Sequence, residues 1–111
     1  MVKHVLFVKL KDNSPASCEA VKELFLSMKE HIDFIRELQV GIDYLHSERS
    51  YDVVLELVVD SPEDLERYQS NDYHVHKVKS YIHKVRSASA TVADLLGIEP
   101  NEHWNPSIIK K

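Results

Sequence analysis

Residues 2–10 alternate between two faces, and this alternation constrains the fold more than any other feature of the chain. A period of two residues is typical of a β-strand and does not fit a helix. One face is apolar except for a single imidazole: Val2, His4, Leu6, Val8 and Leu10. The opposite face is apolar only at its centre, at Val5 and Phe7. We therefore predict a strand whose first face meets helices and whose second face is partly covered by a partner subunit.

Two Ser-Pro pairs predict where helices begin. Ser14 and Ser61 suit the N-cap position, and the proline after each suits the first helical position, where a missing N–H costs nothing. After Ser14, apolar residues recur at helical spacing: Cys18, Val21, Leu24, Phe25, Met28 and Ile32. After Ser61 we expect a short helix that turns Tyr68 inward. A break at residues 70–72 then precedes a last helix over about 73–85.

Three further strands complete the pattern. Alternation predicts strands over about 37–45 and 51–59, joined by a polar loop of hairpin length, and small and β-branched residues predict a fourth over about 87–95. The order strand, helix, strand, strand, helix, strand is that of a ferredoxin-like α+β fold. We expect a βαββαβ domain with a four-stranded antiparallel sheet and its helices on one face.

The helix-free face of this sheet predicts a homodimer. Its apolar members are Val5, Phe7, Val54 and Val58. Two such sheets packed face to face would bury these side chains, which a small single domain cannot cover by itself. Glu56 lies between Val54 and Val58 on this face. It either stays exposed or meets a polar group of the partner.

Composition narrows the class of protein. The chain has 111 residues, enough for one domain, and 18 acidic against 14 basic residues give a net charge of −4. This balance argues against nucleic acid as a partner, which would require a basic surface. No segment approaches the roughly 18 apolar residues of a membrane span, and no signal-peptide pattern is visible. We expect a cytoplasmic protein with no membrane partner.

Metal and cofactor motifs are not found. Cys18 is the only cysteine, so neither an intrachain disulfide nor a cysteine zinc cluster can form. Two glycines in the whole chain make a Gly-rich phosphate loop improbable, and no redox-cofactor motif is present. We expect neither a metal nor a cofactor.

His4, Tyr68 and His74 are polar rings on elements that face the core. On a helical wheel of the last helix, His74 lies at the edge of the apolar stripe, whereas His76 and His83 fall on the far side. A metal shared by His74 and His76 is therefore not expected, because residues two apart on a helix do not face each other. The three inward rings either form a hydrogen-bonded network in a solid core or line a cavity with a function.

Two short motifs carry a family resemblance. The first is the opening Val2-Lys3-His4, and the second is Tyr68-x-x-Asn71-x-x-His74 before the last helix. With this element order, the chain resembles the stress-responsive A/B barrel (Dabb) family of the dimeric α+β barrel superfamily. The resemblance covers residues 2–96 and implies a domain over residues 1–96 that forms a homodimeric barrel. Residues 97–111, with Trp104, would be a C-terminal tail.

The resemblance also implies a pocket between sheet and helices. Plant polyketide cyclases of this fold perform an intramolecular aldol reaction there, and His4, Tyr68 and His74 match their pocket residues. His74 would be a general base with a pKa near neutral. Tyr68 would bind the developing oxyanion or orient His74, and His4 would donate to the substrate or fix a tautomer. The expected walls of the pocket are apolar: Leu6, Val8, Phe25, Leu38, Val53 and Leu55.

Departures from the cyclase pattern argue against polyketide cyclisation itself. Asn71-Asp72 replaces the family's usual His-Pro, although Asp72 can still cap the last helix. Val53 and Phe25 stand where the cyclases have a histidine and a tyrosine. We expect a small apolar or carbonyl-containing ligand and cofactor-free acid–base chemistry if there is catalysis. The alternatives are a structural or interaction dimer without a cavity, and a monooxygenase of the wider superfamily.

Overall fold

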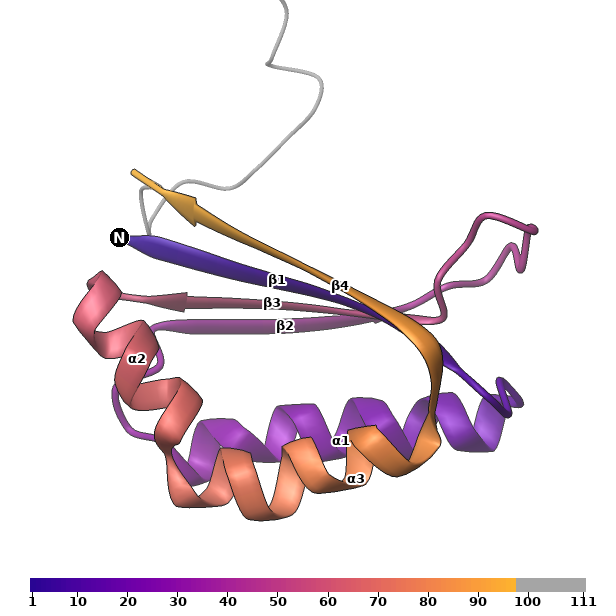
Figure 1. Cartoon of the computed structure of the whole chain (residues 1–111), viewed down its shortest axis with the longest axis horizontal. Helices are drawn as coiled ribbons and strands as arrows, with labels where there is room; N and C mark the ends of the chain where they lie inside the picture. The colour runs from indigo at the N-terminus through magenta and orange to yellow at the C-terminus, as the bar shows by residue number, and fades with distance from the viewer. Residues whose placement is uncertain (98–111) are drawn as a thin grey trace, which may run out of the picture.

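The structure is a computed structural model and describes residues 1–97, apart from the side chains of residues 88–90. Residues 98–111, which include Trp104 and all of the expected tail except Gly97, lie outside the described residues. The elements, in chain order, are β1 (Val2–Leu10), α1 (Pro15–His31), β2 (Glu37–Ile42), β3 (Val53–Val59), α2 (Pro62–Ser70), the π-helix η1 (His74–Lys79), α3 (Ser80–Val85) and β4 (Arg86–Leu96) (Figure 1).

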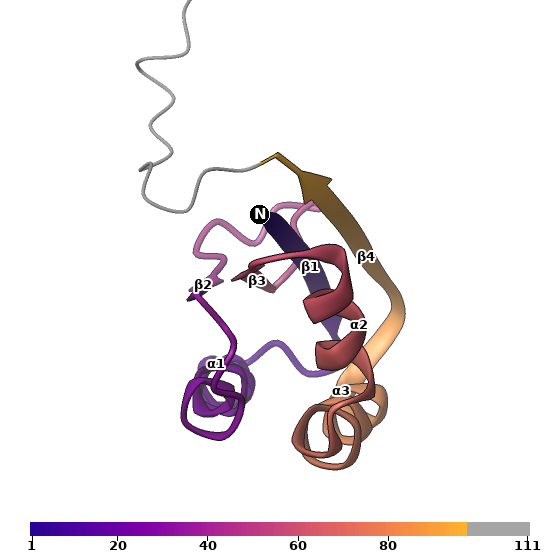
Figure 2. The same cartoon turned by 90° about the vertical axis from the view of Figure 1, so that its left-hand side faces the viewer.

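The four strands form one antiparallel sheet in the order β2-β3-β1-β4. The helices cover one face of this sheet, with α1 on the β2 side and α3 on the β4 side (Figure 2). The central strand β1 pairs on both sides, so that His4 lies opposite Leu57 of β3 and Asp94 of β4. The ferredoxin-like α+β fold predicted from the element order is confirmed.

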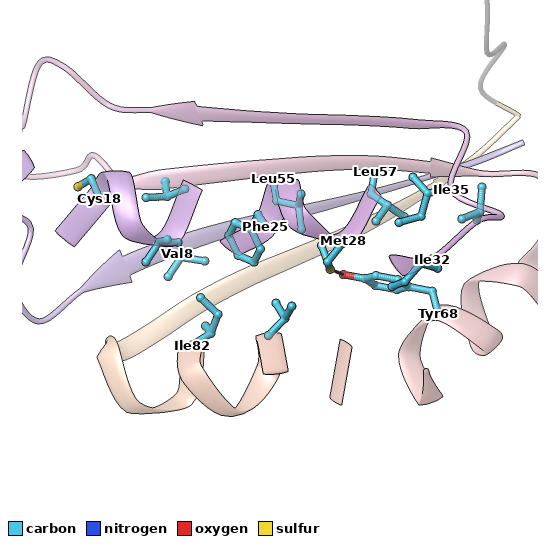
Figure 3. Close-up of a cluster of buried hydrophobic side chains, with 14 of the residues drawn as sticks. Val8, Cys18, Phe25, Met28, Ile32, Ile35, Leu55, Leu57, Tyr68 and Ile82 are labelled. Carbon is cyan, nitrogen blue, oxygen red and sulfur yellow. Dashed lines mark hydrogen bonds between the residues drawn. The ribbon is translucent and has the colours of Figure 1, made fainter. Parts of the chain in front are cut away.

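Helix α1 begins where its Ser-Pro signal predicts. The Ser14 hydroxyl accepts a hydrogen bond from the Ser17 backbone N–H at 3.3 Å, and Pro15 is the first helical residue. Four residues at helical spacing are buried against the sheet: Cys18, Val21, Phe25 and Met28. They pack over β2 and β3, where Val53, Leu55 and Leu57 are fully buried (Figure 3). The half of the sheet beneath α1 is therefore a closed apolar core.

The hairpin between β2 and β3 differs from its predicted length. β2 ends at Ile42, and Tyr44 is 88% exposed although alternation places it on the strand's apolar face. The strand ends because the Asp43 carboxylate accepts a hydrogen bond from the His46 N–H at 2.6 Å and turns the chain away. Periodicity does not detect this local competition with strand pairing.

The last helical segment is not the single α-helix predicted over 73–85. A π-helix, η1, precedes the six-residue helix α3. Asn71 Oδ1 accepts a hydrogen bond from the His74 N–H at 3.1 Å. The cap of this segment is therefore Asn71 and not Asp72, whose side chain is fully exposed. Because a π-helix bonds residues i and i+5, it advances less than 100° per residue and changes which side chains face the sheet.

The helix-free face of the sheet is covered in part by the chain itself, since Val58, expected to need a partner, is only 2% exposed. Phe7 is 37% exposed, and Val5 and Val54 are half-buried. Glu56 is also half-buried. Its carboxylate forms an ion pair with Lys3 on the neighbouring strand and accepts a hydrogen bond from the Lys3 ammonium at 3.2 Å. This face thus combines apolar side chains with one cross-strand charge pair.

Within residues 1–97, every helix is too short or too polar to cross a bilayer.

A buried carboxylate fixes the chain where β1 ends. Asp52 is 3% exposed, and its carboxylate accepts hydrogen bonds from the Leu10 N–H at 2.7 Å and from the Asn13 amide at 3.3 Å. We expect Asp52→Ala to lower the free energy of unfolding by about 1–3 kcal/mol, because it leaves a buried N–H without a partner. Urea denaturation measures this. The exposed Asp33 is the control, and Asp33→Ala should change the free energy by less than about 0.5 kcal/mol. Equal effects of the two substitutions would contradict the assigned role.

Candidate functional site

A cavity of about 410 Å³ lies between the helices and the β1–β4 half of the sheet. Its buried end is formed by Leu6 of β1, Phe25 of α1, and Val78 and Ile82 of the last helical segment. Three polar rings complete this end, one from the first strand and two from consecutive helical elements late in the chain: His4, Tyr68 and His74. The volume lies in the range of small-molecule sites in proteins.

The six apolar residues expected to line a pocket separate into two groups. Leu6 and Phe25 line the cavity. The other four pack in or against the closed core instead: Val8, Leu38, Val53 and Leu55. The reason is the position of α1, which fills the space over β2 and β3 and leaves the open space on the β1–β4 side.

His4 is held by a carboxylate on the adjacent strand. The side chain of His4 is 8% exposed, and its Nδ1 lies 2.6 Å from Oδ1 of Asp94, which faces it across the β1–β4 ladder. A carboxylate can only accept, so Nδ1 carries the proton and donates it. This contact fixes the imidazole tautomer and leaves Nε2 with a lone pair, available to accept a proton.

Tyr68 packs against both histidines. Its ring centroid lies 5.6 Å from that of His4 and 4.2 Å from that of His74. The hydroxyl donates a hydrogen bond to the Met28 sulfur at 3.8 Å (Figure 3), and burial raises the pKa of the phenol above its ordinary value. We expected the Tyr68 hydroxyl either to bind the developing oxyanion or to orient His74. The hydroxyl bonds Met28 instead of His74, so it does not orient His74, and its ring packs against both imidazoles.

His74 is an imidazole that burial keeps neutral. Desolvation lowers its pKa from 6.5 to about 4, and nearby His4 and Lys79 act in the same direction. The Gln69 carbonyl partly offsets the effect, but it makes no well-aligned hydrogen bond with Nδ1, which is buried without a partner among residues 1–97. The expectation of a near-neutral pKa is wrong. At pH 7 His74 is a neutral ring and a much weaker base than expected.

The exposed end of the cavity, which we call the rim, is polar and basic. Its members are Gln69, Lys79, His83, Arg86 and the half-exposed Val92. The helical wheel placed His83 on the far side of the last helix, away from the site. This prediction is wrong, because the π-helix changes the direction in which the following side chains point. His76 does point away, with a side chain that is 76% exposed.

Asp94 is the site residue that sequence reasoning missed. It lies in β4, which was recognised only by its small and β-branched residues. The alternation of β4 gave one signal. Asp94 is two residues after Val92, so both side chains lie on the same face of the strand. Its pairing with His4 depends on the β1–β4 register, which joins residues 90 positions apart in sequence and which local pattern does not set.

No three His, Cys, Asp or Glu side chains in the described part of the chain converge in the way a metal ion requires.

The fold and the cavity define a ferredoxin-like α+β domain with a buried histidine, His4, and a half-buried one, His74, between its sheet and its helices. Residues 2–95 match the sequence profile of the stress responsive A/B barrel domain (Dabb), and the chain belongs to this family. The resemblance inferred from the two short motifs is thus confirmed. A comparison with curated protein sequences gave no match.

Three solved structures illustrate the similarity of fold. A protein from Arabidopsis thaliana has a TM-score of 0.74 at 22% identity, over 89% of this chain and 97% of that one. A dimeric ferredoxin-like protein of unknown function from Bacteroides fragilis has a TM-score of 0.71 at 23% identity, over 85% and 93%. Hydroxynitrile lyase from Passiflora edulis has a TM-score of 0.72 at 14% identity, over 88% and 94%. At these identities the similarity establishes the fold.

The pKa of His74 predicts a pH dependence of stability. The pKa of His74 is about 4 in the folded chain and near 6.5 in the unfolded chain. Between pH 4 and pH 6.5 the unfolded state therefore binds more protons than the folded state. The contribution of neutral His74 to the free energy of unfolding is therefore complete above pH 6.5, and it is lost as the pH falls toward 4. We expect His74→Gln to remove this part of the pH dependence and His76→Gln to retain it. Urea denaturation at pH 7 and pH 4.5 compares them, and an NMR titration of His74 near pH 6.5 would contradict the assignment.

Proposed function

We propose that this protein is a homodimer that binds a small, mostly apolar molecule in the cavity and performs cofactor-free acid–base chemistry on it. The observation that carries the proposal is the pair of imidazoles, His4 and His74, at the buried end of one 410 Å³ cavity. In a structural network packed in a solid core, the imidazoles would border no open space. That His4 and His74 both line the cavity supports a binding site over such a network.

The environments of the two histidines support a division of roles. His4 donates Nδ1–H to Asp94, so its Nε2 would accept a proton from a carbon next to a ligand carbonyl. The resulting imidazolium would form an ion pair with Asp94. His74 stays neutral at pH 7 and would donate a hydrogen bond to the oxygen on which negative charge develops. This proposal exchanges the roles that the family resemblance implied.

Asp94 would act as a positioning residue for the proton transfer. Its carboxylate touches His4 and no other polar group of the cavity lining within the described residues. Replacing it with asparagine would keep the size of the side chain but would permit the other His4 tautomer. One neighbour in fold, the Passiflora edulis protein, is named as a hydroxynitrile lyase, which is compatible with a fold that hosts lyase chemistry. A fold neighbour named as an antibiotic biosynthesis monooxygenase, at 13% identity, bears on the monooxygenase hypothesis, but it shares only the fold with this chain.

Proton abstraction can be tested before the natural substrate is known. In D₂O, we expect the protein to accelerate hydrogen–deuterium exchange next to the carbonyl of 2-octanone, followed by NMR. Asp94→Asn should slow the protein-dependent rate by about 10- to 100-fold, because a general base contributes at least this much. The control is His76→Gln, whose side chain lies outside the cavity. Exchange no faster than in buffer, or an unchanged rate in Asp94→Asn, would contradict the proposed chemistry.

The homodimer rests on the helix-free face of the sheet. Phe7 and Val54 form its apolar centre, and Gly41 leaves open space beside them. A second copy of this face would cover these side chains, since identical patches pair about a two-fold axis. The Bacteroides fragilis relative is described as dimeric, which supports the same arrangement here.

Replacing one apolar residue of the sheet face with a charge tests the dimer. We expect Phe7→Asp to give a monomer in analytical ultracentrifugation, because two carboxylates would be buried opposite each other. Leu26 is a matched control, since it is equally exposed, at 39% against 37%, but lies on the outer side of α1. Leu26→Asp should remain dimeric. A wild-type monomer, or a dimer in Phe7→Asp, would contradict this interface.

A further inference from the structure

The two ends of the cavity differ in charge. The buried end is apolar apart from its three aromatic rings, whereas the rim carries two cations, Lys79 and Arg86. No aspartate or glutamate lines the cavity within the described residues. This is unexpected in a chain whose acidic residues outnumber its basic ones by 18 to 14. The potential at the rim is therefore positive on a protein of negative net charge.

Some cations of the described residues are paired with carboxylates. Lys3 pairs with Glu56 at 3.2 Å, and Arg36 pairs with Asp60 at 2.7 Å. Within residues 1–97, neither cation of the rim takes part in such a pair. The Arg86 guanidinium donates to Nδ1 of His83 at 3.3 Å and keeps its other N–H groups available.

The positions of these side chains suit one anionic group. Lys79 and His83 are four residues apart on a continuous helical segment and lie on the same side of it. Arg86 begins β4 and is tied to His83, so its guanidinium is held on the same side of the rim. A guanidinium next to an ammonium is well suited to a carboxylate, which accepts two parallel N–H bonds from arginine.

We propose that the ligand is a small carboxylic acid with an apolar tail. Its carboxylate lies at the rim against Arg86 and Lys79. The tail extends along Leu6 and Phe25 and would carry the carbonyl of the proposed chemistry toward His4. This inference rests on the proposed function, since it names the ligand class of the same cavity. It also accounts for the polarity of the site, because the charges that line it within the described residues lie at the end that meets water.

Two probes of equal chain length isolate the contribution of the charge. Octanoate and 1-octanol share the apolar tail, and only octanoate is an anion at pH 7. We expect octanoate to bind the full chain about five- to tenfold more tightly than 1-octanol in isothermal titration calorimetry, because ion pairs at an exposed rim are modest in strength. The preference should decrease as salt is raised. NMR shift changes should locate both probes at His4 and Val92.

Charge-matched variants test the residues themselves. We expect the double variant Lys79→Gln/Arg86→Gln to lose the preference for octanoate and to keep its affinity for 1-octanol. The control is Lys77→Gln/Lys84→Gln, which removes two cations of the same helical segment that do not line the cavity. This control should retain the preference.

Three results would overturn the inference, and they separate it from the proposed function. Equal binding of both probes by the wild-type chain would leave an apolar cavity that does not select acids, and the proposed function would stand. A preference lost equally in both double variants would show a general charge effect and no built site. Binding of neither probe would reject the cavity as a binding site and the carboxylate proposal with it.

Discussion

The pairing of β1 with both of its neighbours is the constraint on which the site depends. Because β1 is central, every second side chain of this strand faces the helices, and His4 is one of them. The same ladder sets Asp94 opposite His4 at the edge of the sheet, where a carboxylate can remain partly hydrated. A shift of one residue in the β4 register would turn Asp94 to the other face. Backbone pairing therefore creates the His4–Asp94 contact.

The cavity exists because the helices do not cover the sheet evenly. α1 closes the core over β2 and β3, whereas the other half is covered by α2, η1 and α3. The π-helix lies in this second half and is the only irregular helical turn of the described chain. Such turns disturb regular helix packing and are frequent at functional sites. Here the π-helix carries His74 at its start and Lys79 at its end, one at each end of the cavity.

The sequence predicts the fold well because its signals are local and agree with one another. Alternation in β1, the Ser14 and Ser61 caps and the element order each indicate the same architecture. The site is predicted only in part. His4, Tyr68 and His74 are brought together, but the pKa of His74 follows from burial, and the partner of His4 follows from long-range register. The inclusion of His83 follows from a π-helix that has no recognisable sequence signal.

The proposed chemistry depends on Asp94 holding His4 in the tautomer that leaves Nε2 unprotonated. Long-range ¹H–¹⁵N NMR of the imidazole reads the protonation of each ring nitrogen directly. At pH 7 we expect the His4 Nδ1 to carry the proton and the Nε2 shift to change when 1-octanol is added. In Asp94→Asn, the preference for this tautomer should be lost. A proton on Nε2 in the wild-type chain, or an Nε2 shift unaffected by a bound probe, would contradict the proposed role of this pair.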